Sequence, residues 1–234
     1  MVVENQLKSV ISYQLSKKYG YRDKDYLKLS KSKQNGLYGY RKSVEFEEKE
    51  YTLKLNFLGT HFVMDALGVL AIVHALGGNL SKAISSLEKV EPAGGRGAAI
   101  SIQLENKVVT LIDDAYNANP SSMKAGLKML ALFDERRVAV MGDMLELGAE
   151  SPERHLDLLE NLTQNGPSKV YAVGTQMKQV FDLLPDDQKG AWAETPEALF
   201  SVLVKEIQNG DVIWVKSSHG TGLYRLVEKL KGTK

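Results

Sequence analysis

The sequence predicts an α/β protein whose C-terminal part is a Rossmann-like, mostly parallel sheet with helices on both faces. Beyond residue 98, short apolar segments rich in β-branched residues alternate with longer segments of helical periodicity. This alternation is typical of strand–helix–strand units, which build parallel sheets. The Gly-rich stretch at residues 92–98 indicates a domain boundary. We therefore expect one domain at residues 1–92 and a second at residues 93–234.

The composition is that of a soluble globular protein, with 43% hydrophobic and 25% charged residues. A formal net charge of +1 gives no general electrostatic reason to expect a nucleic-acid or membrane partner. The absence of cysteine excludes disulfides, thiolate metal sites and a cysteine nucleophile. The start of the chain lacks the apolar segment of a signal peptide, and no run is long enough to span a bilayer. A cytoplasmic location is the expectation.

The first domain is predicted to begin with strands and to end with two helices. Asn35 and Gly36 form a strong hairpin turn signal. Thr60 is expected to cap a helix that runs to about Leu76 and is buried on most of its surface, because most of its residues are apolar. A shorter helix is expected to begin near Asn79 or Ser81. The predicted strands lie at residues 10–13, 26–29, 44–46 and 51–55, and the second helix ends at Leu87.

The second domain is predicted to place its polar loops along one edge of the sheet. Right-handed crossovers between parallel strands bring the loops after the strands to the same side. These loops span residues 113–119, 142–151, 174–176 and 216–220. The predicted strands are 99–104, 108–112, 137–141, 169–173, 212–215 and a weak one near Trp192; the predicted helices are 120–133, 152–165, 175–184, 196–208 and 221–231.

Residues 111–130 are the stretch most suggestive of a ligand site. An apolar strand ends in Asp113 and Asp114, and a short polar turn follows. Asn119 suits the N-cap of the next helix, and Pro120 suits its first position. Open α/β sheets bind ligands at the carboxyl ends of their strands, so these residues are candidates for binding. The alternative is that they serve only as turn and cap residues.

One further loop, the Gly-rich stretch and a histidine add candidate groups. Lys216 begins a loop with two hydroxyls and an imidazole, but no G-x-S-x-G elbow surrounds its serines, which excludes an α/β-hydrolase triad. Arg96 either reaches phosphate or ribose or is a solvated linker residue. His155 lies among apolar residues, where a histidine is more often a packing residue than a catalyst. Phosphate-loop and G-x-G-x-x-G motifs are absent, which disfavours a nicotinamide-linked oxidoreductase, and no His/Glu spacing indicates a metal site.

Three motifs together carry a resemblance to a known family. DDAYNANPSSMKAGL at residues 113–127, RRVAVMGDMLELGAESPERH at 136–155 and VKSSHGTGL at 215–223 resemble the Mur ligases of peptidoglycan synthesis. Upstream, residues 58–77 resemble the helix that ends the central ATP-binding domain of that family. By this resemblance, residues 1–92 are the end of the central domain and residues 93–234 are the C-terminal domain.

The resemblance implies an ATP-dependent ligation that adds D-alanyl-D-alanine to UDP-N-acetylmuramoyl-tripeptide through an acyl phosphate, with magnesium as cofactor. Such chemistry depends on positioning and on neutralising phosphate charge. The resemblance assigns catalytic roles to Arg96, Asp114, His155 and Lys216; nucleotide contacts to His61, Asp65, Arg96, Asp113, Asp114, Tyr116, Asn117 and Asn119; and amine-substrate contacts to Asp143, Glu146, Ser217, Ser218 and His219.

The chain departs from the family pattern at several positions. Phe62 and Asp65 stand where the family has asparagines, and Ser217 stands where it has glycine. The phosphate loop, the magnesium ligands and the UDP-binding domain of the family are expected before residue 1. We therefore expect the chain to be inactive alone and to work with a separate half that carries the phosphate loop. The alternative is a non-catalytic nucleotide- or dipeptide-binding module derived from a truncated ligase.

Overall fold

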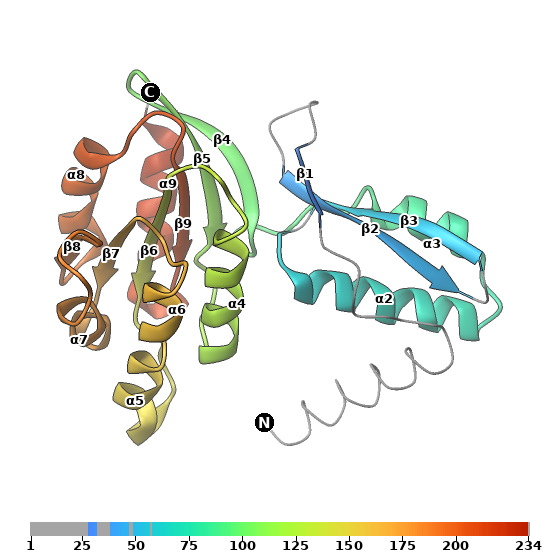
Figure 1. Ribbon diagram of the computed structural model, residues 1–234, viewed down its shortest axis with the longest axis horizontal. Coiled ribbons are helices and arrows are strands. Elements are labelled where there is room, and N and C mark those ends of the chain that lie inside the picture. The colour runs from blue at the N-terminus through green and yellow to red at the C-terminus, as the bar shows by residue number, and fades with distance from the viewer. Residues whose placement is uncertain (1–27, 32–37, 47–48, 57, 234) are drawn as a thin grey trace. The chain divides into compact units, whose positions relative to one another are not determined.

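The computed structural model describes residues 28–31, 38–46, 49–56 and 58–233. The chain forms two compact units, Met1–Glu91 and Pro92–Lys234, which are described one at a time (Figure 1). The predicted strand at residues 10–13 and the predicted turn at Asn35 and Gly36 lie outside the described residues.

The first unit combines antiparallel strands with two helices. Leu53 and Leu55 of its last strand are buried with Leu67 and Leu70 of the first helix and Ile84 of the second, which together form a small apolar core. The predicted strands at 44–46 and 51–55 are confirmed. The elements are β1 (Lys28–Lys31), β2 (Tyr38–Phe46), β3 (Lys49–Leu55), α2 (Thr60–Ala75) and α3 (Leu80–Leu87).

Helix α2 differs from its prediction at its start and in its burial. Its N-cap is Gly59, and the helix begins at Thr60, so the expectation that Thr60 caps it is wrong. The expectation that most of its surface is buried is also wrong, because Val69, Ile72 and Leu76 are 46%, 63% and 82% exposed. Among the described residues, α3 and β3 pack with α2 along one stripe only, and the opposite apolar stripe is left exposed.

The second unit contains a six-stranded sheet in the order β4-β5-β9-β6-β7-β8. Strand β4 pairs antiparallel with β5 at one edge, and the other pairings are parallel. The mostly parallel α/β fold predicted from the sequence is confirmed. The strands are β4 (Ala98–Leu104), β5 (Lys107–Asp114), β6 (Arg137–Gly142), β7 (Lys169–Val173), β8 (Lys189–Ala193) and β9 (Val212–Lys216).

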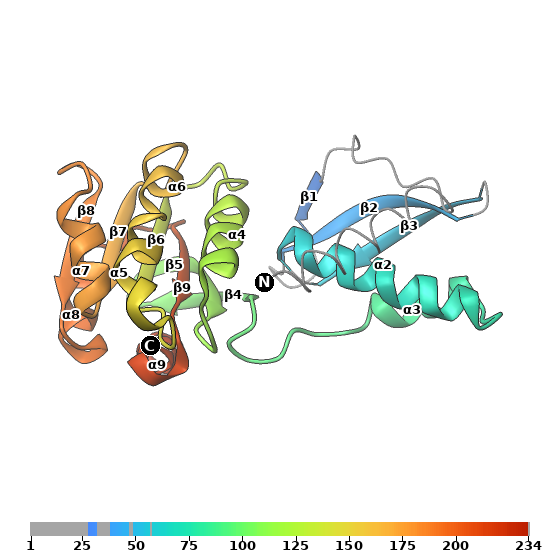
Figure 2. The same cartoon turned by 90° about the horizontal axis from the view of Figure 1, so that it is seen from below.

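Helices cover both faces of this sheet (Figure 2). Right-handed crossovers place α4 to α7 on one face, and the return from β8 to β9 places α8 and α9 on the other. Trp214 of β9 is fully buried against Gly126 of α4, where a Cβ would lie 2.0 Å from the indole ring. The helices are α4 (Pro120–Leu130), α5 (Ser151–Leu156), α6 (Leu159–Thr163), α7 (Thr175–Asp182), α8 (Pro196–Glu206) and α9 (Leu223–Gly232), with short 3-10 turns η1 (Gly148–Glu150) and η2 (His219–Thr221).

The single helix predicted at 152–165 is wrong, because two short helices occupy this stretch. The amide of Leu158 donates to the carbonyl of His155, three residues earlier, which tightens the backbone and ends α5. The side chain of Leu158 is fully buried, so packing favours the break.

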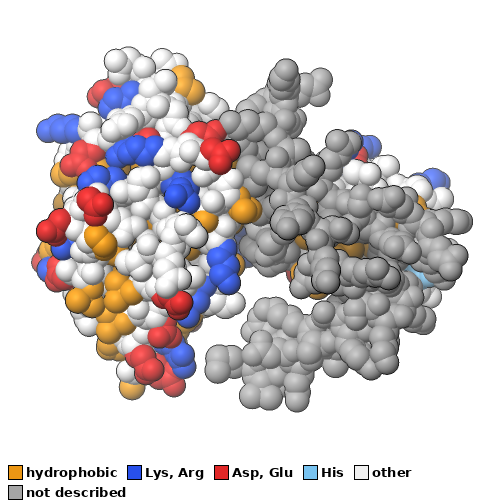
Figure 3. Space-filling view, in the orientation of Figure 1, with side chains coloured by type: hydrophobic (Ala, Val, Ile, Leu, Met, Phe, Trp, Pro, Cys, Tyr) orange, Lys and Arg blue, Asp and Glu red, His pale blue; other side chains and the backbone are white. Residues whose placement is uncertain are grey.

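The surface of the second unit carries both signs of charge. On the face drawn in Figure 3, basic and acidic side chains are interspersed rather than gathered by sign. None of the helices in the described part of the chain combines the length and the apolar character needed to cross a bilayer.

Candidate functional site

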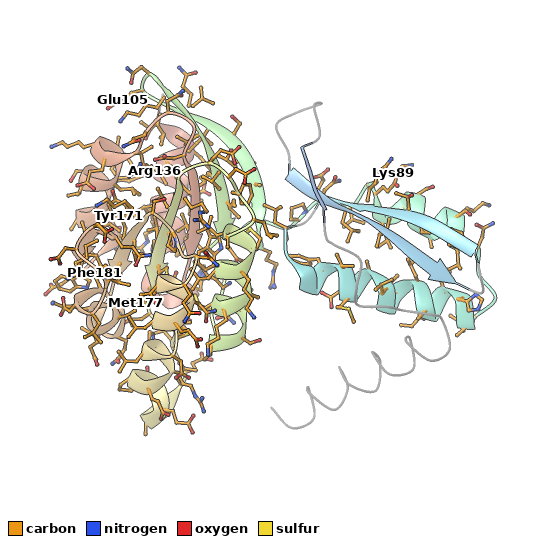
Figure 4. The ribbon with its side chains drawn as sticks, viewed as in Figure 1. Lys89, Glu105, Arg136, Tyr171, Met177 and Phe181 are labelled. Carbon is orange, nitrogen blue, oxygen red and sulfur yellow. The ribbon has the colours of Figure 1, made fainter. Side chains whose placement is uncertain are left out.

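The four predicted loops meet at the carboxyl edge of the sheet, and Ser218 joins three of them. Its hydroxyl donates to the carbonyl of Ala118 at 3.3 Å and accepts from the amide of Leu145 at 2.9 Å. Its own amide donates to the carbonyl of Asp143 at 3.2 Å. Figure 4 places Met177, which follows the fourth loop, toward this end of the strands, and Arg136 toward the other. The predicted convergence of these loops is confirmed.

The strand β5 ends in two aspartates that point to opposite faces of the sheet. Asp114 accepts a hydrogen bond from Lys216 Nζ at 2.9 Å and from the indole of Trp214 at 3.4 Å. Lys216 also donates to the carbonyl of Asn117 at 3.0 Å. The lysine side chain is 4% exposed and the aspartate side chain 24%. The pair therefore joins the ends of β5 and β9 while a part of the carboxylate faces solvent.

On the other face, Asp113 forms an ion pair with Lys231 of α9 at 3.0 Å. Burial lowers the pKa of Lys231, but hydrogen bonds to the Glu228 and Asp113 carboxylates outweigh it and raise that pKa above its ordinary value. Successive side chains along a strand point to opposite faces of the sheet, which explains why the neighbouring Asp113 and Asp114 have different partners. Nothing in the local sequence marks Lys231 as a partner of this loop.

An exposed series of rings and guanidinium groups borders the site, and we name it the aromatic row. The Arg96 guanidinium lies 4.2 Å from the centroid of the Tyr116 ring, and that ring lies 5.9 Å from His219. The imidazole of His219 stacks on Tyr224 at 4.6 Å with an interplanar angle of 6°. Arg225 ends the row, 5.7 Å from the Tyr224 ring. Sequence reasoning identified Arg96, Tyr116 and His219 but missed the two residues on α9.

Asp143 holds the start of α7 in place. Its carboxylate accepts from the amide of Met177 at 2.7 Å and from that of Gln176 at 3.2 Å. Gly174 has a φ of 101° and lies so close that a Cβ there would come within 2.5 Å of the carboxylate. These hydrogen bonds use acceptor positions of the carboxylate within the protein. Glu146, in the same loop, is exposed and has a φ of 64°.

His155 is fully buried, and both of its ring nitrogens have partners. Nε2 accepts from the amide of Met144 at 2.8 Å, and Nδ1 lies 2.6 Å from the carbonyl of Ser151. This pattern corresponds to a neutral ring with its proton on Nδ1. Ser217 is also buried, and its hydroxyl accepts from Thr221 at 2.8 Å. We name Asp143, His155, Ser217 and Ser218 the scaffold cluster, because they hold the loops together.

The two predicted asparagines make local hydrogen bonds. The side-chain oxygen of Asn119 caps α4 by accepting from the backbone amide of Ser122 at 2.8 Å. The backbone amide of Asn119 in turn donates to the Ser122 hydroxyl. Asn117 accepts from the amide of Ala118 at 2.8 Å. In the first unit, Asp65 is exposed on α2, and the side chain of His61 lies outside the described residues. The nucleotide contacts of His61 and Asp65 stay predictions.

The second unit also has a cavity away from these residues. A cavity of about 550 Å³ lies between α4 and α6, and no predicted site residue lines it. Within the described ranges, no three acidic or histidine side chains come together in a way that could hold a metal ion.

A model of one protein family matches residues 98–219, which include the converging loops except for the last residue of the loop at 216–220. Its description is "Mur ligase, glutamate ligase domain", and the match covers more than half of the chain. This chain belongs to the Mur ligase family. The resemblance read from the three motifs is confirmed at the level of the family.

The relatives of this Mur ligase chain include curated ligases and solved structures. The UDP-N-acetylmuramoyl-tripeptide–D-alanyl-D-alanine ligase of Rickettsia prowazekii is 32% identical over 177 residues, covering 75% of this chain and 38% of that protein. The Escherichia coli ligase of the same name is 37% identical over 118 residues, covering 50% and 25%. MurF from Acinetobacter baumannii superposes with a TM-score of 0.74 at 27% identity, covering 88% and 44%. The chain spans well under half the length of the curated relatives it matches.

Proposed function

We propose that this chain is the part of a Mur ligase that positions ATP and the incoming dipeptide for addition of D-alanyl-D-alanine to UDP-N-acetylmuramoyl-tripeptide. The observation that carries the proposal is the convergence of the loops after β5, β6 and β9 on Lys216 and Ser218. The family model matches the residues that contain these loops, and the curated relatives at 32% and 37% identity carry this activity in their names. The fold positions these loops rigidly, and ligation depends on such positioning.

The nucleotide is assigned to the side formed by Asp114, Tyr116 and Arg96. The partly exposed carboxylate of Asp114 is suited to accept hydrogen bonds from ribose hydroxyls, and Lys216 holds it in one orientation. The Arg96 guanidinium lies over the Tyr116 ring, and a stacked guanidinium keeps its N–H groups free for phosphate oxygens. In the proposed reaction, the tripeptide carboxylate attacks the γ-phosphate of ATP and releases ADP, giving an acyl phosphate.

The dipeptide is assigned to the side formed by Glu146 and His219. Its neutral amine attacks the acyl carbon, phosphate leaves, and the amine loses a proton to form the amide. The exposed Glu146 carboxylate is suited to attract the ammonium form of the dipeptide on approach. Magnesium would neutralise phosphate charge in such a reaction. The described residues offer no ligand set that fits this ion, so no step is assigned to it here.

The first unit is proposed to be the end of a central ATP-binding domain that works with a separate half carrying the phosphate loop. The exposed apolar side chains of Val69 and Ile72 on α2 and of its C-cap Leu76 support this, because a stripe of this kind is suited to packing against another protein surface. The synthesis of UDP-linked precursors also favours a cytoplasmic location for the chain.

The test is a reconstitution of ligation. The chain is mixed with the N-terminal part of a D-alanyl-D-alanine-adding ligase, and phosphate release is measured with ATP, tripeptide substrate and dipeptide. Asp114→Ala is expected to raise the KM for ATP by about 10- to 100-fold, equivalent to ~1–3 kcal/mol for an unpaired buried partner. Asp134→Ala, at an exposed residue between α4 and β6, is the control and should leave the KM unchanged.

The outcomes separate the alternatives. An unchanged KM in Asp114→Ala removes this residue from the nucleotide site. Binding of nucleotide or dipeptide without phosphate release in any mixture supports the non-catalytic module instead.

A further inference from the structure

The aromatic row extends beyond the residues assigned to the site, onto the first turn of α9. Tyr224 and Arg225 lie outside the family match, which ends at residue 219. They continue the row that begins at Arg96, so the row has a guanidinium group at each end. Any role of Arg225 in substrate binding rests on the proposed function.

Arg225 is held along one edge of its guanidinium group. Its Nε donates to the hydroxyl of Tyr224 at 3.3 Å. Its Nη1 lies 3.9 Å from the carboxylate of Glu197, and this distance is at the limit of an ion pair. The arginine side chain is 65% exposed. The Tyr224 ring is itself fixed by stacking on His219. The guanidinium is therefore oriented while most of the arginine side chain is exposed to solvent.

The proposed ligation has two anionic substrates to hold at this edge, ATP and the carboxylate of the dipeptide. The ammonium groups of Lys216 and Lys231 are engaged by Asp114 and Asp113. Arg96 and Arg225 are the cations of the aromatic row, and they lie at its opposite ends. Because Arg96 is assigned to phosphate, Arg225 is the group left in the row for the second anion.

We propose that Arg225, positioned by Tyr224, binds the terminal carboxylate of the incoming dipeptide and selects acceptors with a free carboxyl end. The planar fork of arginine matches a carboxylate in two parallel hydrogen bonds. An extended dipeptide spans about 7 Å. This length is greater than the 5.7 Å from Arg225 to the Tyr224 ring, and the His219 ring lies a further 4.6 Å along the row. A dipeptide held at Arg225 therefore extends past the Tyr224 ring, with its amine directed toward His219 and the converging loops.

The test is a nuclear magnetic resonance titration of the full chain with D-alanyl-D-alanine and, separately, with D-alanyl-D-alaninamide, which lacks the carboxylate. The dipeptide is expected to shift the resonances of residues 219–225, and the amide to bind about tenfold more weakly. Arg225→Gln should weaken dipeptide binding by about tenfold and leave amide binding unchanged. Glu197→Gln should tighten dipeptide binding, because it removes a competing carboxylate.

Matched variants distinguish a loss of the positioning of Arg225 by Tyr224 from a general loss of folding. Tyr224→Phe keeps the ring and should bind the dipeptide nearly as the unaltered chain does, whereas Tyr224→Leu should lose both binding and the ring-current shift of the His219 protons. Arg154→Gln removes an arginine of α5 that pairs with Glu150 and is not part of the aromatic row, and it should have no effect on binding.

Two results overturn the proposal. One is equal dipeptide affinity in Arg225→Gln and the unaltered chain. The other is an absence of dipeptide-induced shifts at residues 219–225 while ATP shifts residues 114–119, which would leave the nucleotide part of the proposed function intact. If neither ligand shifts any of the converging loops, the proposed function fails as well.

Discussion

The scaffold cluster and the aromatic row lie along the same edge of the sheet, but they differ in how their polar groups are used. The scaffold residues Asp143 and His155 are buried, and backbone groups of neighbouring loops occupy their acceptor atoms. The residues of the row, such as Tyr116 and His219, are largely exposed, and their contacts are mostly ring to ring or guanidinium to ring. A carboxylate or imidazole in a candidate loop can thus bind a ligand only where folding leaves part of it exposed, as it does for Asp114.

Substitutions in the scaffold cluster and in the aromatic row are therefore expected to have different effects. Changes in the scaffold cluster should lower the free energy of unfolding and reduce binding only through that loss. Changes in the aromatic row should leave stability nearly unchanged and reduce binding directly.

The largest effect is expected for Asp143→Ala. It leaves the amides of Met177 and Gln176 without their acceptor, and it opens a gap beside Gly174. The free energy of unfolding should fall by about 2–4 kcal/mol, measured by urea denaturation. Asp143→Asn keeps one acceptor oxygen and should lose roughly half as much. A variant as stable as the unaltered chain would place Asp143 among the ligand-binding groups instead.

A smaller loss is expected for His155→Phe, which removes the acceptor of the Met144 amide within a buried loop. The expected cost is about 1–3 kcal/mol in the same denaturation experiment. His155→Gln offers a carbonyl oxygen near the position of Nε2 and should recover part of this stability. Full stability of His155→Phe together with lost ligation would contradict the positioning role and support the catalytic one.

Tyr171 of β7 provides a test that depends on pH. Burial and a 2.6 Å hydrogen bond to Glu206 raise the pKa of Tyr171 well above its ordinary value of 10.0. Folding thus favours the neutral phenol, and its contribution to stability is complete below pH 10 and is lost as pH rises through the folded-state pKa. Tyr171→Phe should show less loss of stability above pH 10 than the unaltered chain. Parallel pH profiles for the two proteins would contradict this environment.

The fold was largely predictable because its signals are local. Apolar β-branched segments identify β5, β6 and β9, and right-handed crossovers then require their loops to share one edge. The Asn119 cap of α4 was also predictable, because asparagine is favoured at an N-cap and proline at the first position of a helix. The end of α5 was not, because it depends on the burial of Leu158.

The site was less predictable because its contacts join residues far apart in the sequence. Asp113 and Lys231 are 118 residues apart, and nothing near either one indicates the other. Tyr224 has the spacing of a helix residue, and its stacking on His219 follows only from the turn η2 that brings them together. Likewise, the difference between Asp143 and Glu146 is burial, which the loop sequence does not reveal.

The most direct test of the account is the map of resonance shifts when ATP and D-alanyl-D-alanine are added together to the full chain. The account predicts that the shifts concentrate at residues 114–119 and 216–225, around the junction made by Ser218. Shifts concentrated instead around Arg136, Tyr171 and Asp211, at the other end of the strands, would contradict it.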